Sequence, residues 1–154
     1  MAQQLSFVLP EIDRVSTKNR VENLLEQYRI LLLQVDIEFL PKVTAGYSLV
    51  PPSNTNAFHS STEDAAIKIV DYQRNRTEFI LRMQKSVNRL SFQERSIIVR
   101  RYMLQEEYYD YEVYNELGMS ERKYYRIKAR AFLRLAFALR EEVYVQDGQA
   151  VPTE

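Results

Sequence analysis

The chain has 154 residues, of which 45% are hydrophobic, and its 21 basic and 21 acidic side chains leave a formal net charge of zero at pH 7. It contains no cysteine and one histidine, His59, which excludes disulfides, thiolate metal sites and a histidine metal cluster within one chain. No run approaches the roughly 18 apolar residues of a membrane span, and the N-terminus has no charged-then-apolar export signal. We therefore expect a cytoplasmic protein without a membrane partner.

The scarcity of helix-breaking residues predicts an all-α fold. Only three glycines and five prolines occur, and long proline-free stretches favour helix. The hydrophobic content is sufficient for a real core. We expect a long N-terminal helical hairpin followed by a C-terminal module of three helices.

Residues 1–15 have no sustained hydrophobic period, and we expect an N-terminal arm that docks a few apolar side chains. Ser16 or Thr17 can cap a helix that runs to about Leu40. One face of this helix is apolar and contains Val21, Leu24, Leu25, Tyr28, Leu32, Val35 and Phe39. Further apolar residues widen this face in the middle of the helix. The pattern indicates core packing together with a surface for a second chain or a protein partner, and packing within the chain alone is the alternative.

Pro41 ends that helix and begins a loop over residues 41–60 that is rich in turn-forming residues. A loop of this length is often functional. It has no glycine-rich phosphate cradle, however, and we expect His59 to be a surface residue and not a catalytic base. A capping pattern after the loop predicts a second helix to about Leu90. This helix is long enough to pair antiparallel with the first, so residues 16–90 are predicted to form the hairpin.

Residues 91–142 make up the predicted C-terminal module, and residues 143–154 a polar, flexible tail. Ser91 to Glu94 is a capping box that starts a helix running to about Met103. Asp110 is a candidate cap for a short second helix. Four tyrosines lie in this segment: Tyr108, Tyr109, Tyr111 and Tyr114. We expect them mainly to pack under a small core, with one or two bonding phosphates through their hydroxyls.

The centre of the module is a tight turn between two helices. The short helix ends at Leu117, Gly118 can take the left-handed conformation that closes a helix, and Ser120 can cap the next one. That helix is predicted from Glu121 to about Glu142. Its apolar residues recur every three or four positions, at Tyr124, Ile127, Ala131, Leu135 and Leu139.

The opposite face of this last helix is strongly basic. It carries Arg122, Lys123, Arg126, Lys128, Arg130 and Arg134. From Gly118 to Arg140 there are seven basic residues against one acid, a net of plus six. Such a helix can lie along phosphates while its first turns reach base edges in the major groove of DNA. A solvated amphipathic helix without a nucleic-acid partner is the alternative.

Residues for catalysis are not evident in the sequence. The acidic pairs Glu106-Glu107 and Glu141-Glu142 are adjacent, so on a helix their side chains diverge instead of flanking a substrate. No metal-binding triad, nucleophile with histidine, or phosphate loop is present. We expect no enzymatic activity, no cofactor and no metal site.

Residues 91–139 resemble the promoter-reading C-terminal domain of sigma factors, known as region four. The matching positions are Leu90, Glu94-Arg95, Ile98, Arg101-Tyr102, Leu117 to Ser120, Ile127 to Ala131, and Leu135. This resemblance implies a helix-turn-helix whose second helix enters the major groove with its first two turns. The residues at 122, 125 and 126 differ from the usual sigma ones, so it implies a shared docking mode and not a shared target sequence.

Positions carried over from that resemblance define the predicted DNA-binding residues. Those expected to face bases are Glu121, Arg122, Tyr125 and Arg126. Those expected near phosphates are Lys123, Lys128 and Arg130, with Ser120 capping the helix at the interface.

Over residues 9–143 the chain is also similar to the ArpU family of phage-encoded transcriptional regulators of Gram-positive bacteria. The matching features are Leu9-Pro10 with Ile12-Asp13, the Tyr28 helix, Pro41 with Thr44 and Tyr47, the Pro51 loop with Ser61 to Glu63, and Tyr124 to Arg126. The resemblance implies a regulator of late phage genes inside the bacterial host cell, and our leading hypothesis is a transcription activator. We expect the chain to bind double-stranded DNA of the late promoter region and to contact host RNA polymerase or a second copy of itself through the N-terminal helices.

Two other functions stay open at the sequence level. One is a DNA-packaging recognition protein resembling the terminase small subunit, which would assemble into a ring. The other is an interaction module that grips host polymerase without reading DNA.

Overall fold

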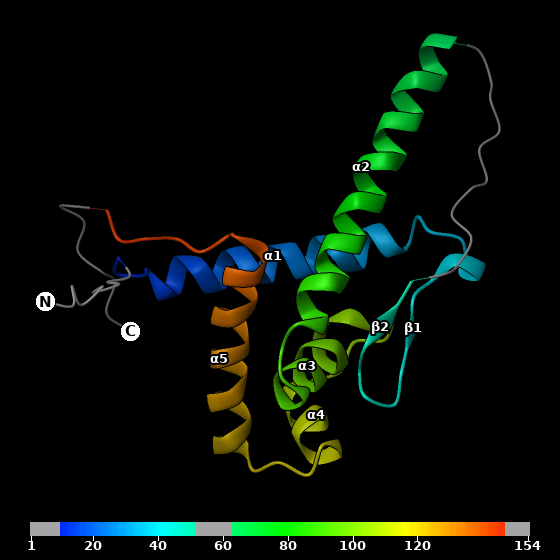
Figure 1. Cartoon of the computed structure of the whole chain (residues 1–154). Helices are drawn as coiled ribbons and strands as arrows, with labels where there is room; N and C mark the ends of the chain where they lie inside the picture. Colours follow the sequence, from blue (N-terminus) through cyan, green and yellow to red (C-terminus); the bar gives the residue numbers. More distant parts are fainter. Residues whose placement is uncertain (1–9, 52–62, 147–154) are drawn as a thin grey trace, which may run out of the picture.

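The computed structural model describes residues 10–51 and 63–146, which form five α-helices, a 3₁₀-helix, a π-helix and one two-stranded sheet (Figure 1). The elements are α1 (Arg14–Leu32), η1 (Ile37–Phe39), β1 (Lys42–Val43), β2 (Leu49–Val50), α2 (Glu63–Asn88), α3 (Phe92–Ile98), η2 (Val99–Met103), α4 (Asp110–Glu116) and α5 (Glu121–Leu139). The small sheet aside, this confirms the predicted all-α class. In the described residues no helix is both long and apolar enough to span a membrane.

The first helix begins earlier and ends earlier than predicted. Its cap is Asp13, whose carboxylate accepts hydrogen bonds from the Ser16 backbone N–H at 3.1 Å and from the Ser16 hydroxyl at 2.7 Å. A carboxylate is a charged acceptor and satisfies the free N–H groups of a first turn well. The helix ends at Leu32, and the backbone is extended at Asp36 and again at Leu40. Pro41 disfavours the helical conformation at Leu40, the residue before it.

Part of the predicted loop is a small antiparallel hairpin. Lys42 pairs with Val50, and Val43 with Leu49. The side-chain amide of Asn88, at the end of α2, accepts from the Leu49 N–H at 2.9 Å and donates to the Leu49 carbonyl at 3.0 Å. Residues 52–62, which include His59, lie outside the described residues.

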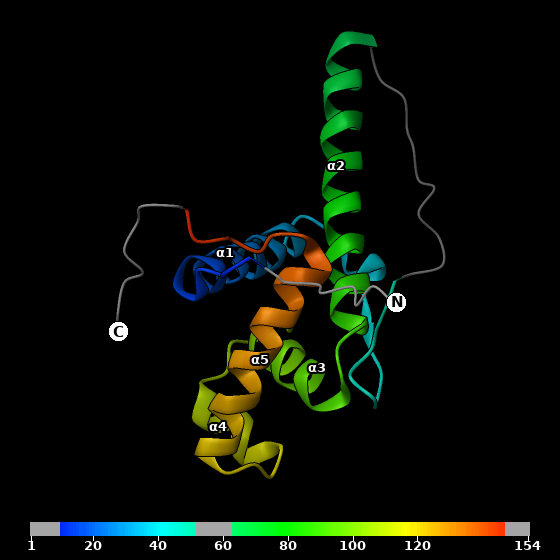
Figure 2. The ribbon, with the colours of Figure 1, turned by 60° about the vertical axis from the view of Figure 1, so that its left-hand side comes forward.

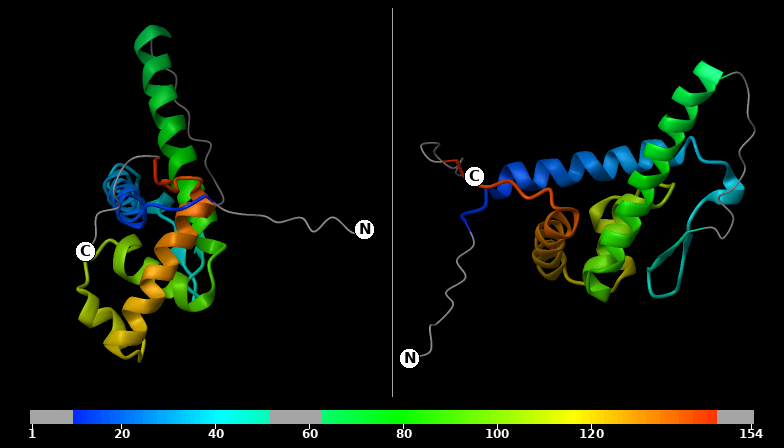
Figure 3. Two further views of the ribbon diagram at one scale, coloured as in Figure 1. Left: turned by 90° about the vertical axis from the view of Figure 1, so that its left-hand side faces the viewer. Right: turned by 45° about the horizontal axis from the view of Figure 1, so that its top comes forward.

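α1 and α2 do not form the predicted hairpin of side-by-side antiparallel helices. They cross steeply, and the N-terminal half of α2 projects away from the rest of the molecule (Figures 1 and 2). The left view of Figure 3 shows the same crossing with α1 nearly end-on and α2 rising beside it. The reason is that α1 contacts α5 and η2 as well as α2, so α2 covers only part of it.

One hydrophobic core joins both halves of the chain. It contains Val21, Leu25, Tyr28, Leu32, Leu49, Ile80, Met83, Val87, Leu90, Ile98, Val99, Met103, Ala131, Phe132, Leu135, Ala136 and Leu139. Within it the Gln84 amide donates to the Tyr28 hydroxyl at 3.3 Å, and burial raises the pKa of Tyr28 to about 12. The predicted boundary between residues 16–90 and 91–142 therefore falls inside one shared core.

The two ends of the described chain are also joined. The Asp13 N–H donates to the Val143 carbonyl at 2.9 Å, and the Val145 N–H donates to the Glu11 carbonyl at 2.9 Å. The Thr17 hydroxyl accepts from the Val143 N–H at 3.0 Å. The predicted tail thus begins with residues that hold the end of α5 against the start of α1.

Candidate nucleic-acid interface

A second, smaller core fixes α4 against α5. Its buried residues are Ile97, Val113, Tyr124 and Ile127, with Tyr108, Tyr114, Leu117 and Met119 packed around them. The rings of Tyr114 and Tyr124 lie 5.5 Å apart between centroids. The two helices are thereby held as one unit with α3.

The turn between α4 and α5 has the geometry that closes a helix with a left-handed residue. Gly118 has φ of +67°, and the Met119 N–H donates to the Tyr114 carbonyl at 2.9 Å. The Gly118 N–H donates to the Asn115 carbonyl at 3.3 Å. This pair of bonds is the Schellman motif, in which glycine avoids the steric cost of a Cβ. The glycine predicted to close the helix does so.

Ser120 begins α5 as predicted. Its backbone is extended, and its hydroxyl accepts from the Lys123 N–H at 3.3 Å. Glu121, in the first turn, places a negative charge where the helix dipole favours one.

The first two turns of α5 present an exposed surface that we call the basic face. It consists of Glu121, Arg122, Lys123, Tyr125 and Arg126, all of which are exposed. Arg122 and Arg126 are four residues apart, so they lie one above the other on the helix surface. Among the residues that the structure describes, no carboxylate lies within salt-bridge distance of Arg122, Lys123 or Arg126.

Most other cations around α4 and α5 are paired within the chain. The pairs are Arg29 with Glu107, Arg100 with Glu116, Arg101 and Lys128 with Asp110, and Arg130 and Arg134 with Glu94. This pairing leaves the free positive charge of the segment concentrated on the basic face.

Lys128, predicted near phosphates, does not lie on the basic face. Its Nζ is 2.9 Å from Asp110 Oδ1, and only 12% of its side chain is exposed. Its ammonium group also lies 5.4 Å from the ring centroid of Tyr102 and 5.9 Å from that of Tyr124. The side chain is turned inward, toward α4.

Arg130 lies at the edge of the basic face and pairs with a buried carboxylate. Its Nε donates to Glu94 Oε1 at 2.8 Å, and Arg134 Nη1 donates to the same oxygen at 2.8 Å. Glu94 is fully buried, and its other oxygen accepts from the Ser91 N–H at 3.3 Å. The sequence predicted the capping role of Glu94. Its second role, as the buried partner of two arginines on α5, has no local signal.

The sequence offers Asp110 as a candidate cap of α4, but Asp110 is not the cap. It is the first residue of the helix, and the cap is Tyr109, whose N–H donates to Glu112 Oε2 at 2.7 Å. The Asp110 carboxylate instead accepts from the Tyr124 hydroxyl at 2.6 Å as well as from Lys128. Tyr109 and Tyr111 are both exposed and stack at 5.8 Å between ring centroids.

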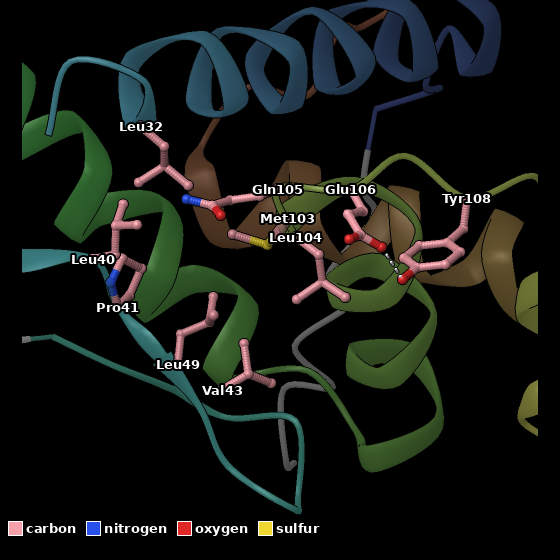
Figure 4. A pocket seen from close by; sticks show the side chains of 10 residues that line it. All are labelled: Leu32, Leu40, Pro41, Val43, Leu49, Met103, Leu104, Gln105, Glu106 and Tyr108. Carbon is pink, nitrogen blue, oxygen red and sulfur yellow. Dashed lines mark hydrogen bonds between the residues drawn. The ribbon is translucent and has the colours of Figure 1, made fainter. Parts of the chain in front are cut away.

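An open pocket of about 430 Å³ lies where α1, the β-hairpin and the end of η2 meet, apart from the basic face (Figure 4). Its lining is mostly apolar and consists of Leu32, Leu40, Pro41, Val43, Leu49, Met103, Leu104, Gln105, Glu106 and Tyr108. The carboxylate of Glu106 accepts from the Tyr108 hydroxyl at 2.6 Å. In residues 10–51 and 63–146 no cluster of three or more histidine, aspartate and glutamate side chains could hold a metal ion. Unlike this mostly apolar pocket, the basic face presents exposed cations without a carboxylate partner in the described residues, and we take it as the candidate site.

Comparison with known proteins finds similar phage proteins. The chain is 35% identical over 133 residues to the uncharacterized phage-related protein Lin1259/Lin1739 of Listeria innocua. The matched region covers 86% of this chain and 93% of that protein. It is 29% identical over 140 residues to protein Gp66 of Listeria phage A118, covering 89% of this chain and 96% of the phage protein. No protein-family model matches the chain. No solved structure matches it.

Proposed function

We propose that this chain, which belongs to the family of the uncharacterized phage-related protein Lin1259/Lin1739 of Listeria innocua, is a sequence-specific DNA-binding activator of late phage genes. In this proposal α4, the turn at Gly118 and α5 act as a helix-turn-helix, with the start of α5 in the major groove. The resemblances to sigma region four and to the ArpU regulators support the same assignment.

The observation that carries the proposal is the basic face. Arg122, Lys123 and Arg126 are exposed and have no carboxylate partner in the described residues, whereas most cations around them are paired. A major groove about 12 Å wide admits an α-helix. Arginine can bond O6 and N7 of guanine together, so Arg122 and Arg126 are assigned to bases and Lys123 to a phosphate.

Genome-wide recovery of bound DNA fragments tests binding, target and late-promoter location together. On the recovered site, Arg126→Ala should weaken binding by about 1–3 kcal/mol and relax preference at one base pair, as measured by fluorescence anisotropy on duplexes with single changes. The matched control is Arg89→Ala, an exposed arginine just after α2 and outside the basic face, which should leave discrimination between duplexes unchanged. Equal weakening on every duplex would remove Arg126 from the base contacts.

Two further measurements separate the rival functions. Footprinting with and without host polymerase identifies an interaction module, because such a module protects no DNA by itself. A stable high oligomer in native mass measurement would favour a terminase-like packaging role.

The proposal includes a contact with host RNA polymerase or a second copy through the N-terminal helices. Its support is the exposure of large apolar side chains on the projecting half of α2, directly after α1 and in η1. These are Leu33, Ile37, Ile67, Ile69 and Tyr72.

A further inference from the structure

Asp110 is the point at which three elements meet. Its Oδ1 accepts from the Tyr124 hydroxyl at 2.6 Å and from Lys128 Nζ at 2.9 Å, both on α5, and from Arg101 Nε at 3.3 Å, on η2. Tyr124 and Lys128 are one helical turn apart on the same side of α5. Two donors so placed, both directed at one carboxylate at the start of α4, constrain the rotation of α5 about its axis as well as its tilt.

The surroundings of Lys128 suit this internal role. Its ammonium group lies within 6.0 Å of the ring centroids of Tyr102, Tyr124, Tyr125 and Phe132. Cations in such positions are attracted to the aromatic faces. Burial alone would lower the pKa of Lys128, but its interactions with Tyr102 and Asp110 raise it above its usual value, so the group stays charged.

Asp110, the acidic partner of the pair, is charged as well. Burial alone would raise the pKa of Asp110, but hydrogen bonds from Tyr124 and Lys128, with the charges of Lys128 and Arg101, hold it below its usual value. At neutral pH the contact is therefore an ion pair, and removing either partner leaves the other charge partly buried.

We propose that Asp110 and Lys128 are positioning residues whose ion pair sets the orientation of α5 against α4, and with it the place where Arg122 and Arg126 meet the bases, without either residue contacting DNA. The proposal rests on the proposed DNA-binding function. It places Lys128, a basic residue two positions after Arg126, inside the domain, whereas its position in the sequence suggests a phosphate contact.

The test compares Lys128→Met and Asp110→Asn with wild type on the recovered site and on a scrambled duplex, over a range of salt concentrations. Each variant should reduce the ratio of specific to scrambled affinity by about fivefold to tenfold, because coupled residues of one network interact on that scale. For Lys128→Met the slope of log affinity against log salt should stay unchanged. The double variant should lose no more than the worse single one.

Lys123→Met is the matched control, because Lys123 is an exposed lysine on the same helix. If Lys123 contacts a phosphate, its variant should weaken binding to both duplexes and reduce the salt slope by about 0.9. A Lys128→Met variant that behaves in this same way would overturn the proposal.

The direction in which Asp110→Asn changes the affinity for DNA is also decisive. Removing a negative charge near DNA should strengthen binding by electrostatics alone, whereas loss of positioning weakens binding to the specific site.

Amide hydrogen exchange of the free protein supplies a readout that does not depend on DNA. Lys128→Met and Asp110→Asn should each speed exchange in α4 and the first turns of α5, and Lys123→Met should not. If Lys128→Met does not fold, Lys128→Arg keeps the charge and should still lose discrimination because a planar guanidinium does not fit the site of the ammonium; retained discrimination would contradict positioning. If wild type prefers no duplex, the proposed function fails, while exchange still decides whether the pair orients α4.

Discussion

Two residues with left-handed backbone close helices by the same bonding pattern but differ in chemistry. Gly118 has φ of +67° and Arg140 has φ of +57°. A Cβ at Gly118 would meet no atom within 4 Å, so the cost of Gly118→Ala is that of the backbone conformation alone, about 1 kcal/mol of unfolding free energy. Arg140→Gly should raise the unfolding free energy by about 1 kcal/mol for the same reason. Urea unfolding of both variants checks the opposite signs, and a loss of stability in Arg140→Gly would mean that the arginine side chain contributes more than its backbone costs.

The Asp110 carboxylate also predicts how stability depends on pH. Its pKa is lowered in the folded chain, chiefly because the bonds from Tyr124 and Lys128 outweigh the opposing effect of burial. A group of this kind stabilises the fold at pH above its unfolded value of 3.8, and this contribution is lost as pH falls through the lowered folded value. The difference in unfolding free energy between wild type and Asp110→Asn should therefore be constant from pH 7 to 5 and shrink below 3.8. A difference that grows on acidification would contradict the assigned bonds.

At the scale of elements, α5 shows what sequence could and could not predict. Its start at Glu121, the closing glycine and the exposed arginines follow from signals only a few residues apart, and the structure has all of them. The inward direction of Lys128 depends on Asp110, 18 residues away, and the pairing of Arg130 depends on Glu94, 36 residues away. A helical pattern shows that a basic residue is near the surface, but it cannot show which distant acid reaches it.

The end of the helix after Ser91 gives a second example. The sequence predicted a helix running to about Met103, and the chain does continue helically, but its last turn is the π-helix η2. From this turn Arg100 Nε reaches Glu116 at 2.6 Å, and Arg101 Nε reaches Asp110. Both partners lie on α4. The spacing of apolar residues encodes neither the change of helical type nor these tertiary contacts.

At the scale of the whole molecule, the neutral net charge conceals a separation of charge. Five acids and no base lie between Leu104 and Leu117, directly before the basic segment that begins at Gly118. Three of these acids pair with cations of α1, η2 and α5, at Arg29, Arg100, Arg101 and Lys128. The acidic segment therefore neutralises cations that face the body of the protein and leaves those of the basic face available. This is why net charge alone was uninformative.

The shared core lies on both sides of the domain boundary that the sequence predicts at residue 90, so a fragment cut there should lose stability. On α5, Phe132, Leu135 and Leu139 are buried in the same cluster as residues of α1 and α2. Burying each such side chain stabilises a fold by about 1.5–3 kcal/mol, so exposing three removes an amount comparable to the whole stability of a small domain, about 5–15 kcal/mol. A fragment of residues 91–146 should therefore show no cooperative thermal transition by circular dichroism, although it contains α3, α4 and α5. Adding a fragment of residues 10–90 should restore the transition, because α1 and α2 then cover the exposed side of α5. If residues 91–146 alone melt cooperatively near the temperature of the full chain, the second core around Ile97 and Tyr124 is sufficient by itself, and the N-terminal helices serve interaction more than stability.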